Sequence, residues 1–476
     1  MNPDTRLTAG NGDRVVVPVA SSLSWPGHAR ATAVLALPLV GAQLTQITIS
    51  VTDTVMIGWL GARELAAAVL ATQAFFFVFI FGSGFAQAAL PLAANAEGKG
   101  DVREVRRAIR MSLWVSGIYA ALVMIPLWHI EGILVALGQK PDVAALSADY
   151  MHVAQWSMFP ALLIMGLRSY LTVLNRAYRV LAVVLAGALS NAVLDYALIF
   201  GEFGAPALGL VGAAIATLGT QIIMAALLFV YTARSREFER YALYQRFWRP
   251  DWAAFFEIIR LGWPIGATVI AEVGLFTASS LMVGWIGTIP LAAHGIALQI
   301  SSIAFMIPLG IGNAATVRVG LAFGRGDPGE LWRAGVSALL LGGTIAFGTA
   351  SLFWLIPDQL VGLYLDPERE NAEAVLAYAA PLLLVAAIFQ IFDSLQAVAS
   401  GVLRGMKDTR TPMFIAVVSY WFVGMPVAYF VAFGAGWGGL GIWSGLASGL
   451  AAAALMLTSR YVYRARRWHG EPGLAG

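Results

Sequence analysis

Four acidic residues lie deep inside long apolar segments of the chain: Asp53, Asp195, Glu272 and Asp393. A carboxylate in the middle of a bilayer costs at least about 2.5–3.5 kcal/mol, so a chain rarely carries four of them without a use. A buried carboxyl group can take up and release a proton, and its ionised form attracts Na⁺ or an organic cation. We therefore expect these acids to handle ions or a cationic substrate.

Structural ion pairs are the alternative for each acid. Few basic residues are available at comparable depth, because Arg168 and Arg318 lie near the ends of their segments. Ion or substrate handling is therefore the stronger interpretation.

A polar stripe leads to the first of the acids. Gln43, Gln46, Ser50 and Asp53 are spaced by three, four and three residues, which places them on one face of a helix. Such a face turns toward another helix or toward water, not toward lipid. For the two glutamines, interhelical hydrogen bonding and the lining of a substrate cavity are equally open.

Amide side chains accompany two of the other acids. Asn191 precedes Asp195 by four residues, and Gln390 precedes Asp393 by three. An amide one helical turn from a carboxyl group can hold a proton on it or help to coordinate a cation.

Two further residues are weaker candidates. His294 could titrate, but a lone histidine near the outer end of a helix more often has a structural role. Pro38 lies within the first apolar segment, where a proline removes a backbone donor and kinks the helix. It is a candidate hinge, and a static kink is the equal alternative.

Composition and segment length indicate a membrane protein. The chain is 59% hydrophobic and 12% charged, with a mean hydropathy of +0.74, whereas about a quarter of a soluble domain is charged. Apolar runs near or above the length needed to span a bilayer, about 20 residues, recur along the whole chain. Each must be helical, because an open strand would leave backbone groups unpaired in lipid. We predict an all-α polytopic membrane protein with twelve transmembrane helices, approximately 33–57, 65–93, 108–128, 150–173, 179–201, 207–232, 256–287, 290–321, 331–357, 375–403, 411–433 and 438–462.

The basic residues predict the orientation. Of the 30 Lys and Arg residues, only Arg63, Lys140 and Arg369 fall in odd-numbered loops. The positive-inside rule then places both termini in the cytoplasm. Abundant Arg, Ala and Gly favour a bacterial source, so we expect a multi-pass protein of the inner membrane. A nucleic-acid partner is not expected, because juxtamembrane basic clusters are the ordinary topology signal.

The chain contains an internal repeat at an offset of 226 residues. Met56–Gly61 recurs as Met282–Gly287, and Gly98–Asp101 recurs as Gly324–Asp327. Six spans in each half is an even number, so the halves are parallel repeats, and such transporters place substrate and ions between or within the halves. We predict a cytoplasmic tail over 1–30, six-helix lobes over 31–240 and 241–465, and a cytoplasmic tail over 466–476.

Several classes of site are excluded. The chain has no cysteine, which removes disulfides, thiolate metal sites and cysteine nucleophiles. No P-loop occurs, so we do not expect ATP to power the protein. No histidines are paired at metal-ligand spacing. We expect no cofactor apart from a coupling ion, and a monomer.

In these features the chain resembles the multidrug and toxic compound extrusion (MATE) family, in the branch of the bacterial norfloxacin exporters, from about residue 30 to residue 465. The resemblance is carried by Pro38, Asp53–Gly58, Ala292–His294, Arg318–Gly320 and Gly401–Gly405. It implies a V-shaped pair of six-helix bundles that exports cationic, often aromatic drugs in exchange for Na⁺ or H⁺.

The resemblance also implies roles for the acids. Glu272 and Asp393 match an acidic cation site in the C-terminal half, and are the expected Na⁺ site. Asp53 matches the acid of the first helix, which other branches use together with Asn191 and Asp195. Acids in both halves leave open which lobe binds the driving ion.

Further residues follow from the same resemblance. Pro38 matches a proline implicated in bending the first helix. Phe389 stands where some members have a tyrosine near the ion, and Gly295 follows His294 where Gln is usual. The expected substrate cavity comprises Gln43, Gln46, Phe389, Gln390 and His294.

The sequence thus predicts a secondary active antiporter for organic cations, and no enzyme. The nearest rival is a lipid-linked oligosaccharide flippase of the same architecture, which should have a cationic cavity, whereas the buried charges here are acidic. An intramembrane enzyme would need a clustered nucleophile or metal ligands, which the sequence does not offer. A passive channel is disfavoured by the duplication with buried acids.

Overall fold

The computed structural model describes residues 23–366 and 371–468, and all regular structure in these ranges is helical, as predicted. Most of the two predicted tails, and Arg369, lie outside the described residues. The first half, here the N lobe, contains α1 (Trp25–Gly58), α2 (Ala62–Gly98), α3 (Val102–Trp128), α4 (Ile130–Ala136), α5 (Pro141–Ala154), η1 (Gln155–Ser157), α6 (Met158–Val173), α7 (Ala177–Phe200), α8 (Gly209–Arg234) and η2 (Arg236–Tyr241). The second half, the C lobe, contains α9 (Trp252–Ile286), α10 (Thr288–Arg325), α11 (Pro328–Leu355), α12 (Pro357–Gly362), α13 (Ala372–Gly405), α14 (Arg410–Val417), η3 (Val418–Gly424), α15 (Met425–Tyr429), η4 (Phe430–Gly434) and α16 (Gly438–Arg467).

Eleven helical segments among the described residues are long and apolar enough to cross a membrane. They correspond to eleven of the twelve predicted spans. The remaining one, 150–173, falls on α5 and α6, which follow each other through the 3₁₀ turn η1. Pro160 gives a physical reason for this interruption, because proline has no N–H to bond the carbonyl four residues earlier.

The repeated Gly-basic-Gly-Asp turn has a direct structural cause. Gly100 and Gly326 have φ angles of +72° and +73°, so each ends its helix in the left-handed region that favours glycine. Asp101 and Asp327 then cap the next helix, each accepting a 2.9 Å hydrogen bond from the amide three residues further on. The same local chemistry therefore turns the chain from α2 into α3 and from α10 into α11.

The first helix of each lobe packs against both lobes. The early part of α1 lies against α10, where a Cβ on Gly310 would be 2.4 Å from the Val40 side chain. The early part of α9 lies against α2, where a Cβ on Gly84 would be 2.4 Å from the backbone nitrogen of Gly266. Glycine at these crossings allows the backbones to approach closely. The two lobes are therefore in close contact at one end of the molecule.

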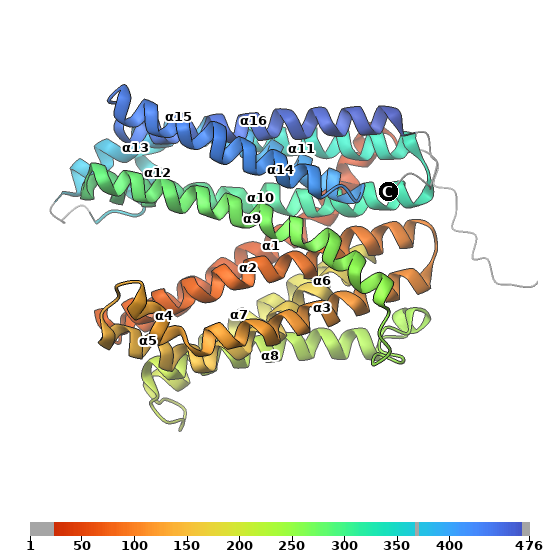
Figure 1. Ribbon diagram of the computed structural model, residues 1–476, viewed down its shortest axis with the longest axis horizontal. Coiled ribbons are helices and arrows are strands. Elements are labelled where there is room, and N and C mark those ends of the chain that lie inside the picture. Colours follow the sequence, from red (N-terminus) through yellow and green to blue (C-terminus); the bar gives the residue numbers. More distant parts are fainter. Residues whose placement is uncertain (1–22, 367–370, 469–476) are drawn as a thin grey trace, which may run out of the picture.

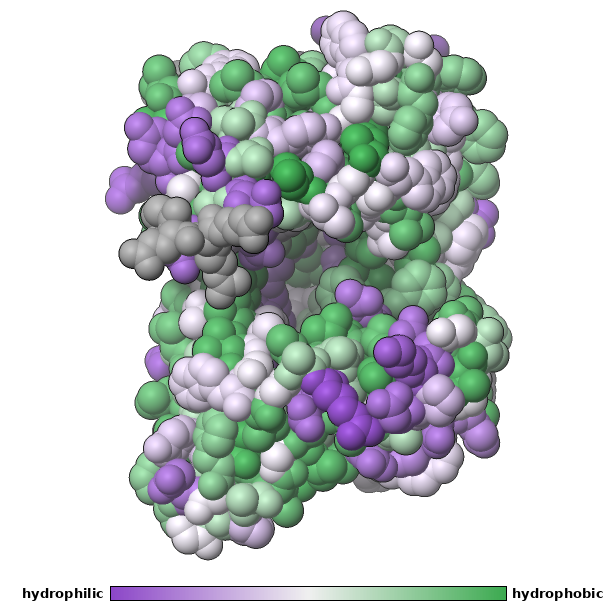
Figure 2. All heavy atoms as spheres, turned by 90° about the vertical axis from the view of Figure 1, so that its left-hand side faces the viewer, coloured by the Kyte–Doolittle hydropathy of each residue, from purple (hydrophilic) through white to green (hydrophobic). Residues whose placement is uncertain are grey.

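The two ends of the molecule differ. We call the end where α1 begins and α16 ends the terminal end, and the end that carries α4 and α12 the far end (Figure 1). Near the terminal end, one hydrophobic core draws residues from both lobes, among them Leu39, Leu167, Ala314 and Leu403. Near the far end, each lobe has a separate core. Figure 2 looks onto the far end and shows a hollow between the lobes. The space between the lobes is therefore open at the far end.

Candidate functional site

The C lobe brings two of the predicted acids together. Glu272 on α9 and Asp393 on α13 interact electrostatically. Tyr420, on the π-helical segment η3, interacts with both carboxyl groups and with Gln396. Asp393 is 3% exposed and Tyr420 is fully buried. Three elements, α9, α13 and η3, thus meet at this acid pair, of which Asp393 is buried and Glu272 is partly exposed.

Polar atoms without partners accumulate at this acid pair. Among the described residues, Asp393 Oδ1, both amide atoms of Gln390, Gln396 Oε1 and the Tyr420 hydroxyl are buried and lack a well-formed hydrogen bond. Buried polar groups are normally hydrogen-bonded. Most of these unsatisfied atoms are oxygens, and they surround a carboxyl pair. A bound cation or a water molecule would satisfy them.

Arg404 lies beside this site and was overlooked in the sequence. It interacts electrostatically with Glu272. It falls one residue beyond the predicted span 375–403, so the sequence alone gives no sign that it reaches Glu272. Arg404 is therefore a third basic residue near the acids, beside Arg168 and Arg318.

The N lobe contains a second acid pair. Asp53 on α1 lies against Asp195 and Asn191 on α7. Asn191 and Asp195 are fully buried. In the described part of the chain, Asp53 Oδ1 and all the side-chain oxygen and nitrogen atoms of Asn191 and Asp195 lack a well-formed hydrogen bond. The structure brings the three predicted residues together, and their role in ion coupling stays a prediction.

Tyr150 completes the site in the N lobe. Its hydroxyl group interacts with Thr72 and Thr217, and it also lies within electrostatic range of Asp53 and Asp195. The sequence offered little signal for it, because one tyrosine at the start of an apolar run is typical of an interfacial aromatic belt. Each lobe thus holds two carboxyl groups beside one buried tyrosine.

The chemistry of both sites suits a proton or a monovalent cation. Within residues 23–366 and 371–468, no three His, Cys, Asp or Glu side chains converge. Carboxylate, hydroxyl and amide oxygens are ligands for hard cations. Na⁺ at Glu272 and Asp393 is compatible with this donor set and stays a prediction.

Two predicted cavity residues lie inside the C lobe. His294 is 1% exposed, and its Nδ1 accepts a 3.1 Å hydrogen bond from Trp443 Nε1. Its Nε2 lies 3.1 Å from Ser280 Oγ, so neither ring nitrogen is free for a ligand in this conformation. Phe389 is 2% exposed and packs on Trp443 with ring centroids 5.4 Å apart. Both side chains therefore support the wall of the C lobe, and a direct contact with substrate would require them to move.

The predicted residues of α1 have different surroundings. Gln43 accepts a 2.8 Å hydrogen bond from Arg168 Nη1, whereas Gln46 is exposed. Pro38 lies inside α1, just before Val40 contacts the C lobe at Gly310. It therefore lies where α1 passes from one lobe to the other, and its role as a hinge stays a prediction.

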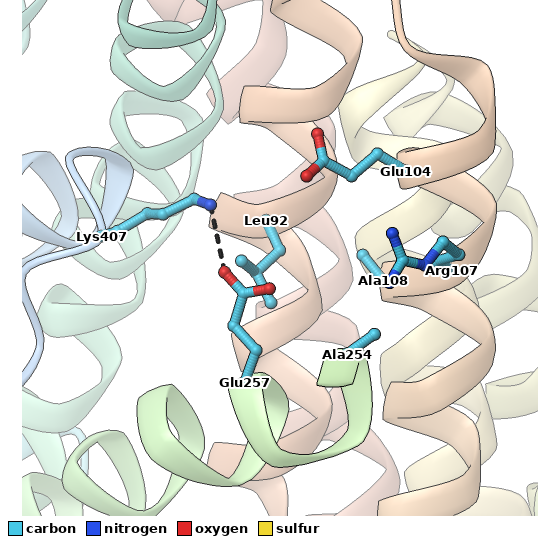
Figure 3. A pocket seen from close by; sticks show the side chains of 7 residues that line it. All are labelled: Leu92, Glu104, Arg107, Ala108, Ala254, Glu257 and Lys407. Carbon is cyan, nitrogen blue, oxygen red and sulfur yellow. Dashed lines mark hydrogen bonds and ion pairs between the residues drawn. The ribbon is translucent and has the colours of Figure 1, made fainter. Parts of the chain in front are cut away.

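Polar contacts close the terminal end. Asn95 on α2 donates a 3.0 Å hydrogen bond across the lobes to the Gly405 carbonyl, and within the C lobe Lys407 Nζ lies 3.2 Å from Glu257 on α9. Figure 3 shows the pocket between α2, α3 and α9 into which Lys407, Glu257, Glu104 and Arg107 point. Its volume is about 30 Å³, room for one or two water molecules. A drug-sized molecule cannot pass this pocket.

Comparison with known sequences identifies close relatives. The sequence model of the MatE family matches residues 38–197 and 264–430. The first residues of these two segments differ by the 226 positions of the internal repeat. The chain is 52% identical to a probable multidrug resistance protein NorM from Rhizobium meliloti (strain 1021), over 95% of this chain and 97% of that protein. It is 47% identical to the protein of the same name from Agrobacterium fabrum (strain C58), over 94% and 96%.

Solved structures share the fold. The crystal structure of the eukaryotic MATE transporter AtDTX14 matches with a TM-score of 0.82 at 21% identity, over 94% of this chain and 99% of that one. A crystal structure of MATE in the straight conformation matches with a TM-score of 0.85 at 19% identity, over 93% and 97%. At these identities the likeness concerns the fold, which is the expected pair of helical bundles.

Proposed function

The chain belongs to the MatE family, and on that premise we propose that it is a secondary active antiporter that exports organic cations across the bacterial cytoplasmic membrane in exchange for Na⁺ or H⁺. Its relatives are called multidrug resistance proteins, and the chain spans nearly their whole length. The observation that carries the proposal is a hollow between two lobes, closed at one end, with two carboxyl groups in each lobe.

The proposed mechanism is competition for the carboxyl groups. In the conformation open at the far end, an ionised carboxyl group can hold an organic cation. Binding of Na⁺ or H⁺ to the same group removes the attraction and releases the substrate. A ligand shifts a conformational equilibrium only by its differential affinity for the two states. The ion-loaded protein must therefore prefer the conformation open at the terminal end, where the ion leaves.

The proposal includes an orientation. Basic residues gather at the terminal end, where Arg107, Arg240, Lys407 and Arg460 all form ion pairs. By the positive-inside rule this end faces the cytoplasm. The hollow then opens to the outside, as a transporter about to release its substrate requires. We further propose that the protein acts as a monomer without ATP.

The rival functions have less support. A lipid-linked oligosaccharide flippase needs cationic groups for a pyrophosphate, whereas each lobe here holds a carboxyl pair. An enzyme is disfavoured because the relatives are multidrug resistance proteins.

The test uses purified protein in liposomes loaded with rhodamine 123, a cationic dye. A Na⁺ gradient and a pH gradient are imposed separately on wild type, Glu272→Gln and Asp195→Asn. Efflux driven by Na⁺ and lost in Glu272→Gln would assign coupling to the C lobe. Efflux driven by H⁺ and lost in Asp195→Asn would assign it to the N lobe.

Two results would contradict the proposal. Full efflux in both variants would exclude a role for the carboxyl groups in coupling. Absence of efflux under either gradient would exclude antiport of this dye and favour the flippase.

A further inference from the structure

The linker between the lobes, residues 242–251, connects η2 to α9 at the terminal end (Figure 1). It is held against α3 of the N lobe by two side chains. Arg110 Nη1 donates a 3.2 Å hydrogen bond to the Arg246 carbonyl. Trp114 Nε1 donates a 3.0 Å hydrogen bond to the Phe247 carbonyl. The linker therefore has a fixed place beside α3.

A group of arginines gathers where the linker meets α3. We call it the basic face, and it comprises Arg106, Arg110, Arg246 and Arg249. In the described ranges none of the four forms an ion pair. Asp251, an acid within electrostatic range of Arg110, is already hydrogen-bonded by Arg107. The basic face thus carries positive charge without a counter-charge from the described protein.

The backbone of the linker is strained at the basic face. Arg246 has a φ angle of +53°, in the left-handed region that a residue other than glycine adopts only at a cost in free energy. Its carbonyl accepts hydrogen bonds from Arg110 Nη1 and from the amide of Arg249. Two members of the basic face thus hold a third in a conformation that it would otherwise avoid.

Exposed aromatic side chains adjoin the basic face in sequence. Trp248 is 71% exposed, Trp252 59% and Phe256 62%. Trp252 and Phe256 are four residues apart on α9, so they lie on one face of the helix, and their ring centroids are 6.5 Å apart. Because α9 is long and apolar enough to span a membrane, exposed aromatic rings in its first turns are expected to contact lipid. Tryptophan is enriched at the level of the lipid headgroups.

This combination favours a phospholipid over a soluble anion. A soluble anion would be attracted by the arginines and would gain nothing from the exposed rings of Trp248 and Trp252. An anionic phospholipid matches both features, because its phosphate is negative and its glycerol and acyl region is apolar. A guanidinium suits the phosphate, since it offers several N–H donors in one plane.

We propose that the basic face binds the phosphate of an anionic glycerophospholipid, whose acyl region contacts Trp248 and Trp252. The lipid belongs to the leaflet at the terminal end, which is the cytoplasmic leaflet in the proposed orientation. The inference goes beyond the proposed antiport and does not depend on it.

Two lipids that differ only in the headgroup test the site. Dioleoylphosphatidylglycerol is anionic, and dioleoylphosphatidylcholine has no net charge. Native mass spectrometry of the purified protein in detergent measures the affinity for each lipid. One arginine near a lipid surface strengthens the binding of anionic lipid about fivefold. We therefore expect wild type to prefer phosphatidylglycerol about tenfold or more. The double variant Arg246→Gln/Arg249→Gln should lose most of this preference.

Matched variants separate a site from overall charge. Arg234→Gln/Arg236→Gln removes two exposed arginines at the end of α8 and the start of η2. It changes the net charge by the same amount and should leave both affinities within about twofold of wild type, because these arginines lie outside the basic face. Trp248→Ala should weaken the binding of both lipids. It tests the site independently if the double variant Arg246→Gln/Arg249→Gln does not fold, which thermal unfolding would reveal.

Several results would overturn the proposal. Equal affinities of wild type for the two lipids would exclude recognition of the headgroup. Equal losses in the two double variants would reduce the preference to overall charge. Displacement of phosphatidylglycerol by an excess of inorganic phosphate would identify a site for free anions instead of lipid. Unchanged affinities in Trp248→Ala would exclude the contact with the acyl region. None of these results bears on the liposome test of antiport, so the two proposals fail separately.

Discussion

Arg404 Nη1 lies 3.3 Å from Gln87 Oε1, and this hydrogen bond joins α13 of the C lobe to α2 of the N lobe beside Glu272. The residue that interacts with an acid of the C-lobe site therefore also bridges the lobes. A cation that binds Glu272 competes with Arg404 for the carboxylate. Displacement of Arg404 would change a contact that the lobe movement of the proposed mechanism has to break. In the proposed mechanism, Arg404 would thus connect ion binding at Glu272 to the conformational change.

Arg404→Gln should raise the affinity of the C-lobe site for its coupling cation. The positive charge beside Glu272 repels a cation, and its removal should lower the half-saturating cation concentration on the order of tenfold. Maximal efflux should fall, because the ion then leaves more slowly. Initial efflux rates from liposomes at varied Na⁺ and varied pH measure both effects.

Gln87→Leu is the matched variant for this prediction. It breaks the bridge between α13 and α2 and keeps the charge of Arg404. The variant should alter the maximal rate of efflux and leave the half-saturating cation concentration unchanged. An unchanged cation affinity in Arg404→Gln would show that Arg404 does not act on Glu272 electrostatically.

The two buried tyrosines allow the lobes to be compared with minimal changes. Tyr150 faces the acid pair of the N lobe, and Tyr420 faces that of the C lobe. Loss of one hydroxyl group should cost about 1 kcal/mol of ion binding. We expect Tyr→Phe in the coupling lobe to raise the half-saturating ion concentration about fivefold, and the other variant to have little effect. The liposome assay measures both, and equal shifts would contradict coupling through one lobe.

Much of the fold could be predicted from the sequence, because few backbone structures are stable in lipid. A long apolar run must be a helix, and a repeat at constant offset must form two similar halves. The interruption at η1 was missed, since its cause is one proline inside an otherwise continuous apolar run. The crossing of α1 and α9 between the lobes could not be predicted, because it depends on glycines such as Gly84 and Gly310 that meet only in the folded protein.

The candidate site was predictable in part for a similar reason. Buried acids such as Asp195 and Asp393 are conspicuous, because a charge in an apolar segment is costly. Tyr150 and Tyr420 are inconspicuous, because tyrosine is common in membrane helices for unrelated reasons. Arg404 could not be placed beside Glu272 from the sequence, because the end of an apolar run does not reveal how far a long side chain reaches back into the protein.

Asp251 provides a pH-dependent contribution to stability outside the membrane-spanning segments. It caps α9, accepts a hydrogen bond from Ala254 N, and is hydrogen-bonded by Arg107 of α3. The Arg107 guanidinium holds the pKa of this carboxyl group below its ordinary value of 3.8. Because the pKa is lowered in the folded state, the ionised carboxyl group stabilises the fold above about pH 4. This contribution to stability is lost as the pH falls through the pKa of the folded state.

Asp251→Asn should therefore destabilise the protein at pH 7 and cease to do so in acid. Asparagine also caps helices well, so the variant loses mainly a partly exposed ion pair, about 0.2–1 kcal/mol. Thermal unfolding of both proteins from pH 7 to pH 3 measures the difference. A stability difference between wild type and Asp251→Asn that stays constant below pH 4 would mean that the ion pair does not contribute to stability.

Two glycines on one face of α16 should not tolerate a side chain. Gly441 and Gly445 lie against the backbone of Ala432 and Ala428, in a segment that π-helical turns interrupt on both sides of α15. A Cβ on Gly445 would be 2.3 Å from the Ala428 nitrogen, so backbone must move to admit it. Gly445→Ala should cost about 1–3 kcal/mol, which a lower thermal unfolding midpoint would reveal.

Gly348→Ala is the control for this prediction. Gly348 lies within α11, and a Cβ there would meet nothing within 4 Å. Alanine is favoured over glycine inside a helix by about 0.5–1 kcal/mol, so this variant should be as stable as wild type or more stable. Both variants add the same methyl group to a helical glycine. If Gly445→Ala lowers the stability and Gly348→Ala does not, the loss is therefore due to the contact with Ala428. A Gly445→Ala protein as stable as Gly348→Ala would mean that α15 and α16 can move apart at this contact without loss of stability.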